Sequence, residues 1–316
     1  LYEGLVPGGS IPWGAWIGPL GYWYLFFLAL SLLMVCLSVI LHRQWSVHER
    51  LDYPMAQVPL AMIEQGAGPL EQLAPLYRNK WTWIGFAVPA VVLSLDALSF
   101  HVPSFPVSSL SYNTLIAFFG GAMVLNFGIH YAWIGFTYLI NLDVSLSIWV
   151  FFLLSKLQDV AFTTFGIAPT EKLSSYNYLT TADLCHQGMG ACVAFVFYAL
   201  WVGRRHLRDV LRKAWRPNEG IDDSEELISY RTAVIGFVLS LSFVGLWLWK
   251  SGIPLLVLPL FLATCLLFYI MISRVIATTG IATARSPMVA AFVLISGLGS
   301  SVIGAQGLAA LAMTYS

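Results

Sequence analysis

The stretch Val144–Phe165 reads VSLSIWVFFLLSKLQDVAFTTF, and its interpretation decides that of the whole chain. An apolar run of about 20 residues crosses the ~30 Å hydrocarbon core of a bilayer as an α-helix. This run nevertheless contains Lys156 and Asp159, although a charged side chain at the centre of a membrane helix costs about 2.5–3.5 kcal/mol. Residues three apart share a helix face, so the two charges partly neutralise each other. The pair marks either a polar pathway within a helix bundle or a simple ion pair whose side chains reach the interface.

The composition is that of a membrane protein. The chain is 58% hydrophobic and 10% charged, whereas soluble domains carry about 25% charged residues. Many of its 12 Trp lie at the ends of apolar runs, as in the aromatic belts of membrane helices. The runs do not alternate apolar and polar residues, which disfavours a β-barrel. We therefore predict an all-α fold, a polytopic transmembrane helix bundle forming a single domain over residues 1–316.

Apolar segments indicate about eight spans, with re-entrant or broken segments among them. The segments are Leu20–Leu41, Trp81–Phe100, Thr114–Ile140, Val144–Phe165, Gly188–Val202, Thr232–Trp249, Ile253–Ile272 and a Gly-rich run that begins near Pro287. The last, residues 287–316, is either a whole helix or two half-helices. Residues 42–80 contain several prolines, and we expect a re-entrant or interfacial segment there.

Basic residues predict the orientation of these spans. If the spans alternate, thirteen of the 16 Lys and Arg lie on one side, only Lys172 and Lys250 lie on the other, and Lys156 lies within a span. The thirteen are Arg43, Arg50, Arg78, Lys80, Arg204, Arg205, Arg208, Arg212, Lys213, Arg216, Arg231, Arg274 and Arg285. Cytoplasmic loops are enriched in Lys and Arg. The 203–231 loop is therefore predicted to be cytoplasmic, in an integral protein expected in a bacterial inner membrane.

Further polar residues are candidates for a substrate or ion pathway. Asp96 is either a protonatable carboxylate within a span or the interfacial end of a helix. Asn126 and His130 are four residues apart and would share a helix face, as a packing surface or a cavity wall. Ser300 and Gln306 lie in the Gly-rich run, whose composition is found both in broken transporter helices and in close helix packing.

Other classes of function lack a signature in the sequence. The net charge is zero, so the composition implies no nucleic-acid partner. The four cysteines are scattered without metal-site spacing, and no H-E-x-x-H, Walker A or dinucleotide-binding fingerprint is present. We accordingly predict no enzymatic activity, no cofactor and no metal site. Because the first residue is Leu1 and the sequence ends within an apolar run, we expect the chain to be part of a longer protein.

Several short motifs carry a resemblance to a known family. They include Leu51, Tyr53 and Pro54 within ERLDYPMA (49–56), IGFTYLI (134–140), DVSLSIW (143–149), QGMGA (187–191) and RRHL (204–207). Together they resemble the oligopeptide transporter (OPT) superfamily, and in particular its large OPT-like bacterial membrane proteins. The resemblance implies a secondary-transporter fold, a re-entrant role for Leu51, Tyr53 and Pro54, and small peptides or metal chelates as cargo. Met55-Ala56 replaces the Ser-Gly that follows the proline in peptide transporters, and this departure leaves the substrate class open.

Two functions remain open from the sequence. The first is an OPT-like secondary transporter that moves a small solute by alternating access driven by an ion gradient, with Lys156 and Asp159 shaping its polar pathway. The second is a structural or accessory subunit of a larger membrane complex, in which the polar groups serve only helix packing. Expected partners are the lipid bilayer, a small solute or ion, and either further copies of the chain or a larger complex.

Overall fold

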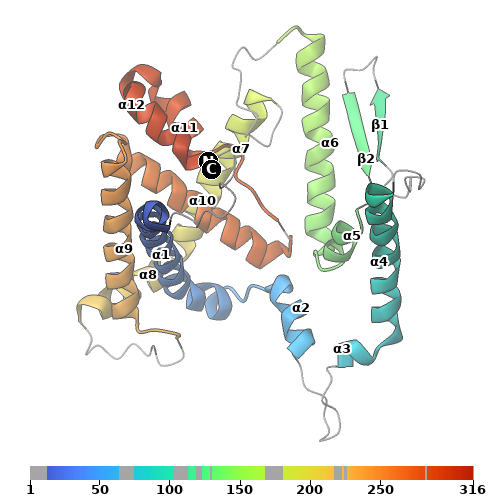
Figure 1. The fold of residues 1–316 in the computed structure, drawn as a ribbon, viewed down its shortest axis with the longest axis horizontal. Helices are drawn as coiled ribbons and strands as arrows, with labels where there is room; N and C mark the ends of the chain where they lie inside the picture. Colours follow the sequence, from blue (N-terminus) through green and yellow to red (C-terminus); the bar gives the residue numbers. More distant parts are fainter. Residues whose placement is uncertain are drawn as a thin grey trace, which may run out of the picture. The chain divides into compact units, whose positions relative to one another are not determined.

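The structure is a computed structural model, and it describes residues 13–63, 75–102, 113–118, 123–128, 130–167, 181–216, 223, 226–281 and 283–315 (Figure 1). Most of these residues are α-helical. In chain order the elements are α1 (Trp13–Arg43), η1 (Gln44–His48), α2 (Pro54–Ile63), α3 (Pro75–Arg78), α4 (Lys80–His101), β1 (Asn113–Phe118), β2 (Met123–Gly128), α5 (Tyr131–Thr137), α6 (Leu142–Thr164), α7 (Ala182–Val202), α8 (Arg204–Trp215), α9 (Tyr230–Lys250), α10 (Leu258–Thr279), α11 (Ala290–Leu298), α12 (Ser300–Ala312) and η3 (Met313–Tyr315).

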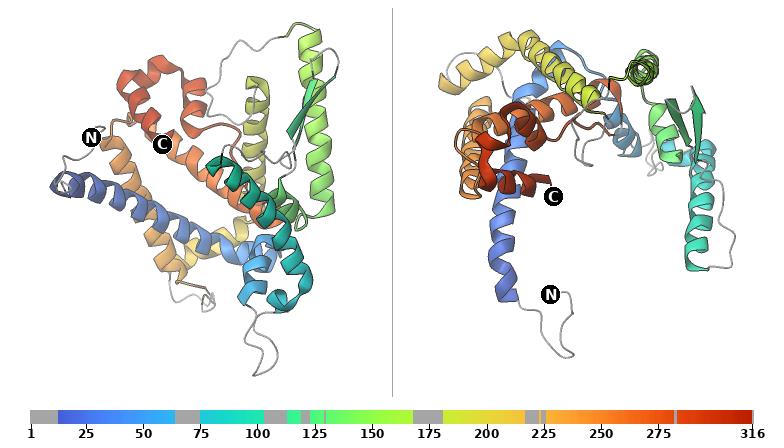
Figure 2. Two further views of the ribbon diagram at one scale, coloured as in Figure 1. Left: turned by 45° about the vertical axis from the view of Figure 1, so that its right-hand side comes forward. Right: turned by 90° about the horizontal axis from the view of Figure 1, so that it is seen from above.

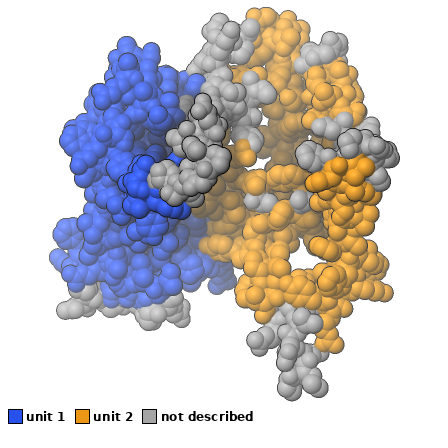
Figure 3. All heavy atoms as spheres, viewed as in Figure 1, with its two compact units in different colours: residues 1–50, 191–268, 288–316 blue, residues 51–190, 269–287 orange. Residues whose placement is uncertain are grey.

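The contacts within the chain divide it into two compact units. Unit 1 comprises Leu1–Arg50, Ala191–Phe268 and Met288–Ser316, and unit 2 comprises Leu51–Gly190 and Tyr269–Pro287 (Figure 3). The chain passes between the units after Arg50, within α7, within α10 and after Pro287. Each unit is described below by itself.

Five helices among the described residues are long and apolar enough to cross a membrane. They are α1 continued through η1, α6, α7, α9 and α10. A helix satisfies its own backbone hydrogen bonds, which is the requirement for crossing hydrocarbon. The chain is thus built as an α-helical membrane protein, although the described residues give five candidate spans rather than eight.

The predicted span Thr114–Ile140 is wrong. The structure instead has the antiparallel pair β1–β2, in which Ile116 lies opposite Leu125, followed by the short helix α5. The sequence between the strands contains Gly120 and Gly121, and a Gly-Gly pair between two apolar, β-branched runs is a hairpin signal. Apolar content alone had led to the prediction of one long helix.

The Gly-rich run forms two short helices, one of the two alternatives drawn from the sequence. α11 ends and α12 begins at Gly299, which has φ 82° and ψ 151°. Gly304 interrupts α12 with φ 73° and ψ 164°. These positive φ values suit glycine, which lacks the Cβ that would clash. Glycine therefore sets both breaks in this run.

Unit 1 is centred on the crossing of α1 and α9 (Figure 2). The ring of Trp247 lies 4.3 Å from that of Phe26 and 4.8 Å from that of Tyr22, between centroids. Further along the helices, a Cβ added at Gly236 would lie 2.8 Å from Cys36 Sγ. Small residues allow helix backbones to approach closely in a membrane, where apolar packing supplies the attraction.

This close approach predicts that Gly236→Leu destabilises unit 1. The added side chain must displace α1, at a cost of about 1–3 kcal/mol for overpacking, so we expect a lower thermal unfolding temperature of the purified protein in detergent. Gly85→Leu is the matched control, because Gly85 is also helical and has open space around its missing Cβ. An equal unfolding temperature for the two variants would contradict the proposed packing.

Candidate functional site

The candidate site lies in unit 2, on the second half of α6. Lys156 Nζ lies 3.5 Å from Asp159 Oδ2, and their side chains are 24% and 18% exposed. The apolar side chains around the same helix are far more open, with Leu154 51% and Leu157 52% exposed. The predicted pair therefore forms, and each charge has the other as a partner.

A second polar contact joins α6 to the start of α7. Gln158 Nε2 donates a hydrogen bond to Asp183 Oδ2 over 3.0 Å. Asp183 is in the first turn of α7, where a carboxylate is stabilised by the exposed amides and the helix dipole. The contact connects residues 25 apart in the sequence. It places the end of α6 beside the beginning of α7.

Two buried side-chain oxygen atoms beside this contact have no hydrogen-bond partner among the residues that the structure describes. They are Asp183 Oδ1 and Thr181 Oγ1, two residues before it. Leaving a buried polar atom unsatisfied costs about 1–3 kcal/mol, and more for a charged group. Both atoms accept hydrogen bonds, and the hydroxyl can also donate one. A site of this kind favours an ammonium group, another hydrogen-bond donor or a small cation.

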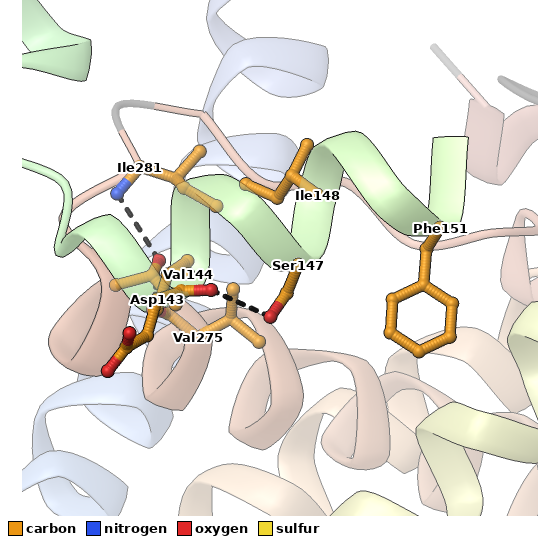
Figure 4. Close-up of a pocket in the computed structure, with 8 residues that line it drawn as sticks. Asp143, Val144, Ser147, Ile148, Phe151, Val275 and Ile281 are labelled. Carbon is orange, nitrogen blue, oxygen red and sulfur yellow. Dashed lines mark hydrogen bonds between the residues drawn. The ribbon is translucent and has the colours of Figure 1, made fainter. Parts of the chain in front are cut away.

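A shallow hollow lies against the first half of α6, also within unit 2 (Figure 4). Its volume is about 440 Å³, and its lining is mainly apolar: Val144, Ile148, Phe151, Val275 and Ile281, with Asp143, Ser147 and Thr279. The hydroxyls are already engaged, since Ser147 Oγ donates to the Asp143 carbonyl and Thr279 Oγ1 donates to that of Val275. The hollow thus offers mostly apolar contact.

The hollow and the α6–α7 contact share one face of α6. Ser147, Phe151 and Gln158 follow at spacings of four and seven, which bring side chains back to the same side of a helix. Eleven residues separate Ser147 from Gln158, a distance of roughly 16 Å along the axis. Lys156 and Asp159 point away from this face by the same geometry. Gln158 therefore lies on the face of α6 that the hollow and the α6–α7 contact share.

The other predicted pathway residues are placed differently. Asn126 lies on β2 opposite Leu115, and His130 precedes α5 as its N-cap residue, so the helix face expected to hold both does not exist. Both are exposed. Asp96 lies on α4, with its side chain outside the described atoms. Ser300 and Gln306 lie on α12 in unit 1, and both are exposed.

The segment carrying Leu51, Tyr53 and Pro54 packs against the end of α10 within unit 2. The Tyr53 amide donates to the Ala277 carbonyl over 3.1 Å, and a Cβ at Gly280 would lie 2.8 Å from Pro54 Cβ. Tyr53 has φ 43°, a left-handed conformation that is unfavourable for a residue with a side chain. The sequence predicted a re-entrant or interfacial segment over residues 42–80, and its described part includes η1, this junction, α2 and α3.

A separate buried polar group lies in unit 1, on α8. His206 is 7% exposed, and its Nε2 donates to the Ile40 carbonyl over 2.9 Å. Its ring lies 5.8 Å from that of His48 and 5.9 Å from that of Tyr230, between centroids. Burial lowers the pKa of His206, and the nearby His48 and Arg43 lower it further, whereas the Ile40 carbonyl and Asp209 act in the opposite direction. The neutral imidazole is therefore favoured in the folded protein.

Among the described residues, no group of three His, Cys, Asp or Glu side chains is arranged to hold a metal ion. Five apolar helices and a polar contact between two of them define the class of this chain as a helical membrane protein. Its sequence matches DUF6785, a family of unknown function, over residues 1–316, and the chain belongs to that family. No curated protein and no solved structure matches it.

The lowered pKa of His206 predicts that the folded protein loses stability on acidification. The contribution of His206 to the free energy of unfolding is fully present above about pH 6.5, the ordinary pKa of histidine. It falls at lower pH because the unfolded chain then binds the proton more readily than the folded chain. His206→Gln keeps a donor for Ile40 and removes the titration, so its unfolding temperature should fall less between pH 7.5 and 5.5. His130→Gln, at an exposed position, should behave as the wild type. Parallel pH profiles for all three proteins would contradict the assignment.

Proposed function

We propose that the chain is an OPT-like secondary transporter for a small polar solute. The observation that supports this most directly is the pair of buried oxygens on Thr181 and Asp183, which have no hydrogen-bond partner within the described part of the chain. They lie at the contact of two helices that are apolar enough to cross a membrane. Buried polar atoms without a partner are costly, and polar groups within membrane helices commonly line substrate or ion pathways.

The route proposed for the solute follows one face of α6. It begins at the hollow beside Ser147 and Phe151 and reaches Gln158 and Asp183. The orientation predicted from the basic residues places the hollow at the cytoplasmic end of α6 and Asp183 at the external end. A solute moving along this face would exchange apolar contacts for polar ones about midway through the helix.

The charge asymmetry supports this orientation even with five spans. Replacing the predicted spans Trp81–Phe100 and Thr114–Ile140 by a segment that stays on one side removes two crossings, so every later span keeps its direction. The third predicted span that is not among the five, the Gly-rich run from Pro287, follows the last basic residue, Arg285, and leaves the charge count unchanged. Arg78 and Lys80 keep their side as well, and the residues whose side changes, 101–113, contain no Lys or Arg. Thirteen basic residues thus remain on the proposed cytoplasmic side.

The chemistry of the site fits the solute class implied by the OPT resemblance. The Asp183 carboxylate and the Thr181 hydroxyl suit an ammonium group or a bound cation. Lys156 points away from this face of α6 and is paired with Asp159. The group that the site would hold is therefore the ammonium end of a small peptide or the cation of a chelate. An ion gradient would supply the driving force for alternating access.

The second candidate is an accessory subunit of a larger membrane complex. It is favoured by the open apolar surface of α6, on which Leu146 is 65% exposed and Phe151 70%. None of the residues of α6 is buried within the described chain. Such a surface faces either lipid or another membrane protein, and in the second case the polar groups would serve assembly.

Transport is tested by uptake into proteoliposomes. Labelled dialanine and a labelled iron(III) chelate serve as probes, under an imposed proton or sodium gradient. We expect uptake of at least one probe, and a loss of about tenfold or more in Asp183→Asn and Gln158→Leu, because each removes a polar contact of the site. Asp209→Asn is the control, since Asp209 is an exposed carboxylate on α8. Normal uptake by a folded Asp183→Asn protein would remove Asp183 from the pathway.

The Lys156–Asp159 pair is tested with the same assay. If the pair shapes the pathway, Lys156→Met and Asp159→Asn both reduce uptake. If it only neutralises charge within α6, the single variants lower the unfolding temperature while the double variant restores it, with uptake retained. Purification of a stoichiometric partner, together with the absence of uptake of either probe under either gradient, would favour the accessory subunit.

A further inference from the structure

We infer that the α7–α8 junction in unit 1 is a binding surface for an anionic phospholipid. The surface, here called the junction surface, consists of Phe197 and Trp201 on α7 and Arg204, Arg205 and Arg208 on α8. All five side chains are exposed. The surface combines an apolar part and a basic part in the order in which a lipid presents its acyl chains and its headgroup.

The two parts of the junction surface share one side of the helix. Hydrogen bonds from the Gly203 amide to the Ala199 carbonyl and from the Leu207 amide to the Gly203 carbonyl, both 3.0 Å, continue the helical ladder across the junction. Residues 197, 201, 204 and 208 then follow at spacings of four, three and four, which keep them on one face. The aromatic strip of α7 therefore leads directly into the basic strip of α8.

The Trp201–Arg204 contact marks the depth of the membrane interface. The Arg204 guanidinium lies 4.7 Å from the centroid of the Trp201 ring, and Arg204 Nη1 donates to the Trp201 carbonyl over 2.8 Å. Phe197 stacks on Trp201 from the other side of the turn, at 6.3 Å between centroids. Tryptophan is enriched at the level of lipid headgroups, and arginine reaches from there towards phosphate. Trp201 lies at the end of the candidate span Ala182–Val202.

Arg205 and Arg208 are the residues assigned to the headgroup phosphate. They lie three residues apart, so their guanidinium groups extend from neighbouring positions on the helix. Neither forms an ion pair with a described residue. The opposite face of α8 is fixed by packing, with His206 and Val210 buried in unit 1. The basic face is therefore presented outward by the fold, and arginine is well suited to phosphate through paired hydrogen bonds.

Charge complementarity selects an anionic lipid over a zwitterionic one. Phosphatidylglycerol carries a net negative charge, whereas the choline group of phosphatidylcholine cancels its phosphate and would face the same arginines. The aromatic strip selects a lipid over free phosphate, because inorganic phosphate gains nothing from Phe197 or Trp201. Basic clusters directly beside a membrane span recognise anionic lipids in general.

The test is binding of a fluorescent short-chain phosphatidylglycerol, and of its phosphatidylcholine counterpart, to the full chain in nonionic detergent. We expect tighter binding of phosphatidylglycerol, with a preference that weakens as salt rises. Arg205→Gln combined with Arg208→Gln should reduce that affinity roughly thirtyfold, from the loss of two charges near an anionic surface. The control is Lys80→Gln combined with Lys250→Gln, which removes two exposed positive charges elsewhere and should retain the preference.

Three outcomes would overturn the inference. One is an unchanged preference in the Arg205/Arg208 double variant, provided that its unfolding temperature without added lipid equals that of the wild type. Another is an equal loss of preference in the Lys80/Lys250 control, which would indicate that the preference depends only on the net charge of the protein. The third is full competition by inorganic phosphate at the concentration of the lipid, which would indicate a phosphate site without a lipid component. Trp201→Ala gives a supporting readout, because it should weaken binding of both lipids while the preference remains.

Discussion

Polar groups within the apolar helices must find their hydrogen-bond partners inside the chain, and the structure depends on this constraint. The hydroxyls of α6 bond back to its own carbonyls, as Ser147 does to Asp143 and Thr163 to Asp159. Gln158 cannot do so and reaches Asp183 on α7 instead. The hydrogen bond connects two helices whose sequences are mainly apolar. Thr181 and Asp183 retain buried oxygens that no described residue satisfies, and the site departs from the constraint at these two atoms.

The sequence was sufficient to predict those helices whose bounds depend only on the length and apolar character of a run. The predicted spans Val144–Phe165 and Thr232–Trp249 correspond closely to α6 and α9. The prediction for Ile253–Ile272 was shifted, because α10 begins only at Leu258, beyond Pro254, and continues to Thr279. The prediction of one helix over Thr114–Ile140 was wrong, because a Gly-Gly pair between apolar runs favours a hairpin over a helix. Apolar content does not distinguish these outcomes, whereas turn chemistry does.

The candidate site was only partly accessible from the sequence. Lys156 and Asp159 were predicted because an i, i+3 pair is a local pattern, and the pair forms. The Gln158–Asp183 contact depends on how two helices pack, and no periodicity within either helix predicts a partner on the other. A signal was nevertheless present, since Gln158 lies between the two charges and Asp183 precedes the apolar run of α7. The pairing of Asn126 with His130 failed because it assumed a helix where the chain forms a strand.

The π-helical turn η1 has a consequence for how this family varies. The Glu49 amide bonds to the Gln44 carbonyl five residues before it, over 2.9 Å, and Gln44 Nε2 donates to Glu49 Oε1 across the same turn. A π-turn contains one residue more than the α-turn that it replaces. A relative lacking one residue between positions 44 and 49 can close this turn to α-helical geometry and keep α1, which precedes it, intact. A single-residue gap at this point in related sequences would thus record a local change of winding, with the fold on both sides retained.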